Sequence, residues 1–368
     1  MDGAVRFEME GDFDGSSAAS LADFEDVELL ASGNFGKVFL VRSQVTGRHY
    51  ACKSLDKAAI VHLNQVEHVK SEKALLSSLT SPFIVKLHNS FQTATRLFLL
   101  LDYVGGGDLF FLLRRTQCFP ERIAKFYAVE VLCGLEYLHS LCVLYRDLKP
   151  ENCLITETGH LKLCDFGFAT QLASPTGRTY TLCGTPEYAA PETVTRLGQS
   201  FPVDYWALGV LIFEMLTGNA PFRGASPYDT YNAILRGEPV YPPSMSKTAR
   251  ELCMSLLERD EANRLGSGAH GIADIKAHGW FARINWTQAA RQEGMKVPWV
   301  PTMRTAGDAT QFRRARKVDL STGSARPAPL ISSPSPAKVP MMSPTSRANI
   351  ENSPRSHTGS YGGLFYGF

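Results

Sequence analysis

The stretch that decides the fold runs from residue 145 to residue 152 and reads Tyr145-Arg146-Asp147-Leu148-Lys149-Pro150-Glu151-Asn152. After a short β-rich segment, 153–164, the chain continues with Asp165-Phe166-Gly167. This order concentrates two carboxylates, an amide and a lysine in one place. Phosphoryl transfer needs that set, because a carboxylate takes a hydroxyl proton, oxygen ligands bind Mg²⁺ and a cation faces the phosphate charge. The alternative is a surface cluster of mixed charges, and the order and spacing argue against it.

A glycine-containing turn lies upstream and reads Gly33-Asn34-Phe35-Gly36-Lys37-Val38. Glycines inside a hairpin let backbone amides approach phosphate oxygens, because no Cβ stands in the way. A tight β-turn that uses the same glycines is the alternative interpretation.

Lys53 ends the apolar strand-like run Tyr50-Ala51-Cys52-Lys53. A lysine on a core-facing strand needs an anion, and a phosphate and a carboxylate are the usual two. Glu72, which lies 19 residues later on a predicted helix, is the candidate carboxylate. A solvated lysine at a strand end is the alternative for Lys53 alone.

Hydrophobic periodicity predicts an α+β chain. Residues 27–53 alternate in the pattern of three antiparallel strands, 64–79 have helical spacing, and 84–91 and 97–104 are strand-like. After the breaker Gly105-Gly106-Gly107 the pattern is mostly helical, over 121–140, 202–217, 226–236, 246–258 and 270–278. A small β-rich lobe therefore precedes a larger α-rich lobe, with a glycine-marked hinge between them.

The charge of the chain is unevenly distributed. Residues 1–26 sum to −7, residues 27–300 to +3 and residues 301–368 to +6. This excludes a uniformly basic nucleic-acid binder, because the basic excess lies in the tail. No apolar run approaches the ~20 residues of a membrane helix, and no signal peptide is visible. Eight cysteines without a Cys-x-x-Cys pair indicate reduced thiols in a cytoplasmic or nuclear protein.

Taken together and in this order, the motifs resemble those of a protein kinase. The segment Leu182-Cys183-Gly184-Thr185-Pro186-Glu187-Tyr188 is similar to the AGC group of Ser/Thr kinases, and the segment from Ile60 to His68 resembles the catalytic subunits of cAMP-dependent kinases. The resemblance covers about 24–320 and the last four residues. It implies the bilobal kinase fold, in which a small β-rich N-lobe with one main helix precedes a larger α-rich C-lobe. The implied units are an acidic extension (1–26), the N-lobe (27–103), the C-lobe (104–300) and a C-terminal tail (301–368) with a Pro/Ser-rich insert at about 321–356.

The resemblance also implies ATP and Mg²⁺ as cofactors, with a role for each matching residue. Asp147 would deprotonate the acceptor hydroxyl, while Lys149 steadies the γ-phosphate and Thr185 packs against both. Lys53, braced by Glu72, would hold the α- and β-phosphates. The implied metal ligands are Asn152 and Asp165. The implied nucleotide contacts are Ala31, Gly33, Phe35, Gly36, Val38, Ala51, Leu101 and Phe312. A structural ion pair between Glu192 and Arg264 would stabilise the large lobe.

Acidic residues along the cleft carry the expected substrate preference. Asp108, Glu151 and Glu214 match family positions that meet arginines upstream of the acceptor. Protein substrates of the type Arg-Arg-x-Ser/Thr are therefore expected, with the next, apolar residue held by Leu182, Pro186 and Ala189. Solvated surface acids are the alternative.

Regulation is expected at Thr181 and at the end of the chain. In the family this threonine is phosphorylated, so an upstream activating kinase is an expected partner, and the phosphate would pair with Arg146 and His68. Phe365 and Phe368 resemble the family's terminal Phe-x-x-Phe, which docks beside the helix that carries Glu72. An unmodified loop threonine and a partner-binding aromatic peptide are the respective alternatives.

Several positions depart from the family pattern. Ala31 replaces the first glycine of the glycine-rich turn, and Thr170 stands where a lysine would help to bind the phosphothreonine. Tyr180 replaces a tryptophan that meets the regulatory subunit, so a cAMP-binding regulatory subunit stays an open partner. Arg313-Arg314 replaces an acidic pair. The rival hypotheses are a pseudokinase scaffold and an aromatic-ended docking module. The presence of Lys53, Glu72, Asp147, Asn152 and Asp165 favours an active enzyme.

Overall fold

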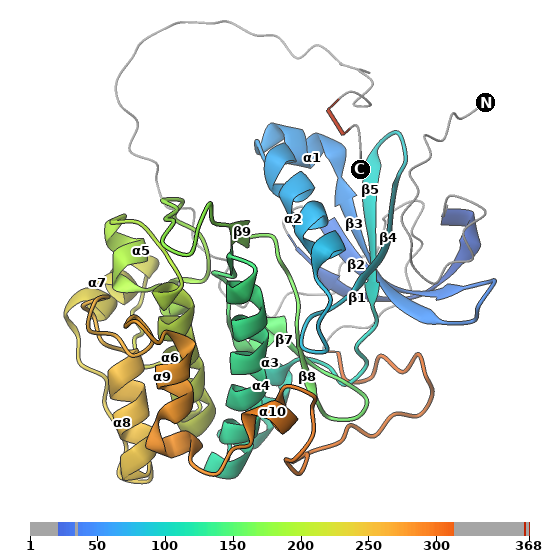
Figure 1. Ribbon diagram of the computed structural model, residues 1–368. Helices are drawn as coiled ribbons and strands as arrows, with labels where there is room; N and C mark the ends of the chain where they lie inside the picture. The colour runs from blue at the N-terminus through green and yellow to red at the C-terminus, as the bar shows by residue number, and fades with distance from the viewer. Residues whose placement is uncertain (1–20, 34–35, 313–363, 366–367) are drawn as a thin grey trace, which may run out of the picture.

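The computed structural model describes residues 21–33, 36–312, 364–365 and 368 (Figure 1). Most of the acidic extension, Phe35, Arg313-Arg314 and the Pro/Ser-rich insert lie outside the described residues. The described chain forms a five-stranded antiparallel sheet with helices, followed by a helix-rich region, as the sequence predicted.

The N-terminal sheet has the strand order β1-β2-β3-β5-β4. Its strands are β1 (Phe24–Ser32), β2 (Gly36–Ser43), β3 (His49–Asp56), β4 (Leu87–Gln92) and β5 (Arg96–Asp102). Alternation along β5 decides its two faces, because successive side chains of a strand point in opposite directions. Leu97 and Leu99 pack into the main core with the helices, whereas Phe98 and Leu100 join a second apolar cluster with Phe39 and other residues of β2 and β3.

The first strand begins at Phe24, three residues before the predicted alternation. The Phe24 ring is buried and stacks on Phe91 at 6.2 Å, and it meets Tyr50 edge-on at 6.3 Å. The neighbouring acidic residues Asp23, Glu25 and Asp26 interrupt the apolar alternation, so the sequence pattern does not show that the strand begins at Phe24.

Two helices lie against the sheet, α1 (Lys57–His62) and α2 (Val66–Ser78). The sequence predicted α2 and missed α1, which is six residues long and too short to show a helical period. Asp56 caps α1 by accepting a hydrogen bond from the Ala59 amide at 3.0 Å. On α2 the buried Val69, Glu72 and Leu76 share the inner face, so the helix carries one carboxylate into the cleft.

The larger region is built around α6 (Pro202–Thr217), whose residues are buried from Pro202 to Met215. Its apolar character on all sides suits a helix at the centre of a core, and α4 and α8 pack directly against it. The other helices are α3 (Leu109–Thr116), α4 (Glu121–Ser140), α5 (Pro191–Thr195), α7 (Pro227–Arg236), α8 (Lys247–Leu256), α9 (Ile272–Ala277) and α10 (Trp286–Ala289). The short strands are β6 (Val143–Leu144), β7 (Cys153–Ile155), β8 (Leu161–Leu163) and β9 (Thr170–Gln171).

The predicted glycine hinge lies under residues 301–311 of the tail. A Cβ on Gly106 would stand 2.6 Å from Pro301 Cγ, and one on Gly107 would stand 2.7 Å from the Gln311 carbonyl oxygen. Gly107 also has a φ of +81°, which side-chain-bearing residues rarely adopt. Gly106 and Gly107 therefore let the tail cross the hinge closely, Gly106 against the Pro301 side chain and Gly107 against the Gln311 backbone.

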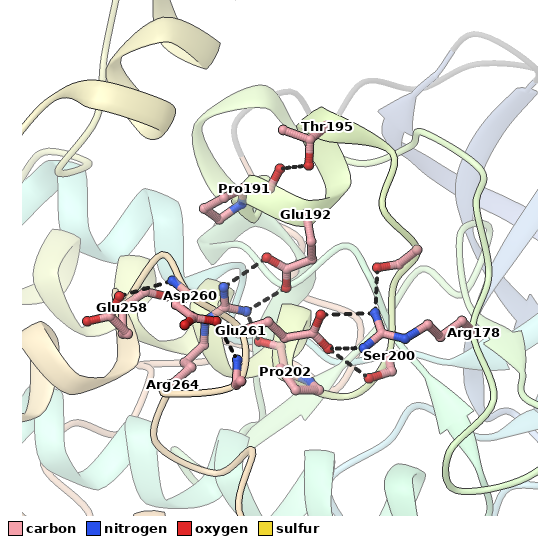
Figure 2. Close-up of polar contacts among 12 residues, drawn as sticks. Arg178, Pro191, Glu192, Thr195, Ser200, Pro202, Glu258, Asp260, Glu261 and Arg264 are labelled. Carbon is pink, nitrogen blue, oxygen red and sulfur yellow. Dashed lines mark hydrogen bonds and ion pairs between the residues drawn. The ribbon is translucent and has the colours of Figure 1, made fainter.

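A buried ion pair joins helix α5 to the loop between α8 and α9 (Figure 2). Arg264 donates to both carboxylate oxygens of Glu192, at 2.6 and 2.8 Å, and to the Pro202 carbonyl at 2.9 Å. Both side chains are almost fully buried. This is the ion pair that the resemblance implied. None of the helices in the described ranges is both long and apolar enough to cross a membrane.

Candidate active site

Three polar side chains meet around the Asp147 carboxylate. Lys149 Nζ lies 2.8 Å from Asp147 Oδ2 and 3.0 Å from Thr185 Oγ1. Thr185 donates to Asp147 Oδ1 at 3.2 Å, and the Asn152 amide donates to Asp147 Oδ2 at 2.8 Å. The carboxylate is thereby fixed from three sides. Burial raises the pKa of Asp147 above its ordinary value, although Lys149 opposes the shift, so this carboxylate is a stronger base than one in water.

A second cluster forms where the sheet faces the larger lobe. Lys53 Nζ lies 2.6 Å from Glu72 Oε1 and 3.2 Å from Asp165 Oδ1. Burial alone would lower the pKa of Lys53, but the two carboxylates raise it, so the ammonium stays charged. The same ammonium holds the pKa of Asp165 below its ordinary value. This cluster therefore offers one cation and one ionised, half-exposed carboxylate to a ligand.

The candidate metal ligands are brought together by the hairpin of β7 and β8. Its register pairs Cys153 with Leu163, and the Cys164 amide donates to the Asn152 carbonyl at 3.0 Å. Both hydrogen bonds of the Asn152 side chain use its nitrogen, which turns the amide oxygen away from Asp147. An amide oxygen and an ionised Asp165 carboxylate are the hard ligands that Mg²⁺ prefers.

In the part of the chain that the structure describes, no group of three or more His, Cys, Asp or Glu side chains could hold a metal by itself. A site with two protein ligands suits Mg²⁺, which commonly keeps waters and binds substrate phosphates. The residues present therefore fit a metal that arrives with a nucleotide.

One carboxylate that the sequence did not indicate supports residues 145–152, hereafter the catalytic loop. Asp204, on the first turn of α6, is fully buried and accepts hydrogen bonds from the amides of Tyr145 at 3.0 Å and Arg146 at 2.8 Å. His139 Nε2 lies 2.8 Å from the same group. Arg146 has a φ of +67°, a strained value for a side-chain-bearing residue, and the bonds to Asp204 hold it there. The available signal was that Asp204, like Glu214, is an acid inside a largely apolar helix.

Most of the predicted nucleotide-pocket residues lie on neighbouring strands of the N-terminal sheet. Val38, Ala51 and Phe312 pack together with Leu30 and Leu40, and Leu101 lies opposite Ala51 across β3 and β5. The Phe312 ring lies 6.1 Å from the ring of Tyr103. The tail thus contributes an aromatic side chain to the wall formed by the sheet.

The structure requires a glycine at only one of the two described glycine positions of the turn, Gly33 and Gly36. A Cβ on Gly36 would stand 2.1 Å from the Ser54 carbonyl oxygen, so this glycine is required by strand packing. A Cβ on Gly33 would meet nothing closer than 3.9 Å, and its amide donates to the Gly36 carbonyl at 2.8 Å. Ala31, in β1 opposite Val38, is exposed.

The three predicted substrate acids lie near one another. Burial raises the pKa of Glu151, and the negative charges of Glu214 and Asp108 raise it further. Asp108 also caps α3 through the Phe111 amide at 2.6 Å. Glu214 is buried, accepts from the Tyr188 hydroxyl at 2.6 Å and lies 3.2 Å from Arg114 Nη2. The sequence did not indicate that an arginine of the same chain reaches Glu214.

The segment from Asp165 to Glu192, hereafter the activation segment, carries Thr181 on its surface. Leu182 and Pro186 are half-buried and Ala189 is buried. Arg146 Nε donates to the Phe168 carbonyl at 2.7 Å, while its buried Nη1 has no hydrogen-bond partner among the described residues. An unpaired buried guanidinium nitrogen is costly and suits an incoming anion. The contact that the structure shows for His68 is with Gln65, at 2.7 Å.

Both terminal phenylalanines are buried against the small lobe. Lys57 Nζ lies 5.4 Å from the centre of the Phe365 ring, and Lys73 Nζ lies 5.2 Å from that of Phe368. Gln92 donates to the Phe365 carbonyl at 3.2 Å. Lys73 follows Glu72 directly, so the chain end packs on the helix that carries this carboxylate.

Comparison with known proteins now adds to this geometry. Residues 24–281 match the protein kinase domain. The chain belongs to the protein kinase family. The kinase is 43% identical over 311 residues to "cAMP-dependent protein kinase type 3" of Saccharomyces cerevisiae, an alignment that covers 84% of this chain and 77% of the yeast protein.

Two further relatives show how far this likeness reaches. "cAMP-dependent protein kinase, catalytic subunit-like" of Caenorhabditis elegans is 42% identical over 293 residues, 80% of this chain and 73% of that protein. "Ribosomal protein S6 kinase alpha-1" of Homo sapiens is 43% identical over 301 residues, 81% of this chain and 41% of that protein. The chain is therefore a Ser/Thr protein kinase of the AGC group, related to cAMP-dependent catalytic subunits, as its sequence predicted. Membership of this family implies ATP and a divalent metal.

The support that Asp204 gives to the catalytic loop is testable. Asp204→Asn should lower both the melting temperature and kcat, because an amide cannot accept from two backbone donors and His139 as a carboxylate does. Leaving one buried donor unpaired costs about 1–3 kcal/mol. Thermal unfolding and peptide phosphorylation measure the two effects.

Asp229→Asn is the matched control, since Asp229 is exposed on the first turn of α7 and contacts Ser226. This control should leave both quantities unchanged. An Asp204→Asn enzyme with normal kcat would show that the loop does not depend on Asp204.

Proposed function

We propose that this kinase transfers the γ-phosphate of Mg²⁺-bound ATP to Ser or Thr in protein substrates that carry basic residues before the acceptor. The observation that carries the proposal is the network in which Lys149, Asn152 and Thr185 fix the Asp147 carboxylate. Asp147 is the group that accepts the proton of the substrate hydroxyl, and its raised pKa favours that role.

The neighbouring residues divide the remaining tasks. Asn152 and Asp165 hold the Mg²⁺, and Lys53, kept in place by Glu72, faces the α- and β-phosphates. Lys149, whose Nζ lies 2.8 Å from Asp147, stands beside the transferred group. Val38, Ala51, Leu101 and Phe312 would enclose the base, with Ala31, Gly33 and Gly36 on the phosphate side. When bound, Mg²⁺ neutralises phosphate charge, and the protein supplies position and proton transfer.

Three acids support a preference for arginine-containing peptides. Asp108, Glu151 and Glu214 place negative charge on one surface of the larger lobe, and their mutual repulsion is relieved when a cation binds. Glu214 already tolerates one guanidinium, that of Arg114, at 3.2 Å. Leu182, Pro186 and Ala189 provide the apolar surface for the residue after the acceptor.

The substrate proposal is tested by Glu214→Gln with an Arg-Arg-x-Ser peptide. Removing the charge should raise KM for this peptide by about tenfold, the value of one charge-assisted hydrogen bond, and leave KM for ATP unchanged. Steady-state phosphorylation with either substrate varied measures both constants.

Glu238→Gln is the control, because Glu238 is exposed and pairs with Arg259. Equal effects of Glu214→Gln on both Michaelis constants would refute the assignment of Glu214 to the peptide.

We further propose two controls on activity, phosphorylation of Thr181 and docking of the chain end. The unpaired Nη1 of Arg146 supports an anion at Thr181, with His68 as a second donor from α2. Phe365 and Phe368 support α2, and through it the ion pair of Glu72 with Lys53. The sequence likeness also supports a cAMP-binding regulatory subunit and an upstream activating kinase as partners.

The docking proposal predicts that Phe368→Ala lowers kcat several-fold. Burying one phenylalanine contributes about 2 kcal/mol, part of which holds α2 in place. Leu364→Ala is the matched control, since Leu364 is exposed beside the docked residues and should have no effect. Unchanged kcat in both Phe365→Ala and Phe368→Ala would contradict a role for the docked end.

A further inference from the structure

Arg178 of the activation segment forms a two-pronged ion pair with Glu261, in the loop between α8 and α9 (Figure 2). Its Nη1 lies 2.9 Å from Glu261 Oε2 and its Nη2 lies 2.9 Å from Glu261 Oε1. Two parallel bonds fix the orientation of both groups, which a single contact between charges does not. The Arg178 side chain is therefore held in direction as well as in position.

The same contact is extended by a short strip of hydrogen bonds. Arg178 Nη1 also donates to the Gly198 carbonyl at 2.9 Å, and Ser200 Oγ donates to Glu261 Oε1 at 3.2 Å. The backbones of Thr179 and Gln199 exchange hydrogen bonds at 3.1 and 2.8 Å. The side-chain amide of Gln199 donates to the Thr181 carbonyl at 2.7 Å. Residues 178–181 are thus fixed on residues 198–200 by contacts that involve no phosphate.

The loop that carries Glu261 is itself rigid. The Asp260 carboxylate accepts from the Ala262 amide at 3.0 Å and from the Asn263 side chain at 2.8 Å. Three residues after Glu261, the fully buried Arg264 binds Glu192. One rigid loop therefore holds the activation segment at two points, through Glu261 at residue 178 and through Arg264 at residue 192.

Between these two points lie Thr181 and the peptide-facing residues Leu182, Pro186 and Ala189. The phosphate-binding side is less complete, because Thr170 carries no charge and Arg146 Nη1 has no partner among the described residues. The contacts from residues 198–200 and Glu261 therefore provide the support that the structure shows just before Thr181.

We propose that Glu261 is a positioning residue that acts through Arg178 to keep the activation segment in its peptide-accepting geometry when Thr181 carries no phosphate. The proposal rests on the proposed peptide-binding surface and adds a specific support for it. It predicts that this kinase keeps a substantial share of its activity without Thr181 phosphate, and that this share depends on Glu261.

The test compares Glu261→Gln with wild type, each with and without Thr181→Ala. In the Thr181→Ala background, Glu261→Gln should raise KM for the peptide about fivefold, as expected for a partly exposed bidentate pair, and leave KM for ATP unchanged. The effect should be smaller in enzyme phosphorylated on Thr181, because the phosphate then holds the same segment.

Two variants separate positioning from a general loss of folding. In the Thr181→Ala background, Arg178→Glu alone should lower kcat/KM for the peptide. Adding Glu261→Arg, which exchanges the two charges, should restore at least half of that loss. Glu238→Gln removes a different surface carboxylate that pairs with Arg259, and it should change nothing.

The proposal is overturned if Glu261→Gln leaves the peptide KM of the Thr181→Ala enzyme unchanged, if KM for ATP rises equally, or if the charge exchange restores nothing. Measuring a second peptide without arginines separates this result from the substrate proposal. If wild type shows no preference between the two peptides, the role of the cleft acids is refuted. The effect of Glu261→Gln on KM can then still be measured with either peptide.

Discussion

The active site depends on a buried carboxylate that contacts no substrate. The Asp204 carboxylate accepts hydrogen bonds from the backbone amides of Tyr145 and Arg146. These bonds fix the backbone conformation just before Asp147. Arg146 adopts a left-handed φ under this constraint, which directs its side chain toward the activation segment. Because α6 is buried from Pro202 to Met215, the position of the catalytic loop is tied to the core of the larger lobe.

From this fixed loop, charges organise the parts that meet around it. Lys149, Asn152 and Thr185 converge on Asp147, and Lys53 joins the sheet and α2 to Asp165. The loop that bears Glu261 and Arg264 forms ion pairs with two other points of the activation segment, Arg178 and Glu192. These ion pairs connect the sheet, the loop that carries Asp147 and the activation segment, while the hydrophobic core packs around them.

The sequence predicted what is encoded locally. The helical period gave the bounds of α4 and α6, since long amphipathic or apolar helices bear a strong pattern, and the motif order placed Asp147, Asn152 and Asp165 together. It did not reveal Asp204, the contact of Arg114 with Glu214 or the pairing of Arg178 with Glu261, because these partners are 58 to 100 residues apart and share no local pattern. For the same reason the early start of β1 was missed, because Phe24 is held by Tyr50 and Phe91. Helix α1 was missed because six residues are too few to show a helical period.

We propose that the buried Asp147 carboxylate takes the proton of the acceptor hydroxyl. The most direct test is the single-turnover rate of peptide phosphorylation against pH, at saturating ATP, Mg²⁺ and peptide, for wild type and Asp147→Asn. Because burial raises the pKa of Asp147, the wild-type rate should fall as the pH drops through that raised value and protonates the base. Asp147→Asn should lower the plateau rate by about 10²–10⁴-fold and abolish this acid limb. An Asp147→Asn enzyme with the wild-type rate and the same acid limb would contradict the account.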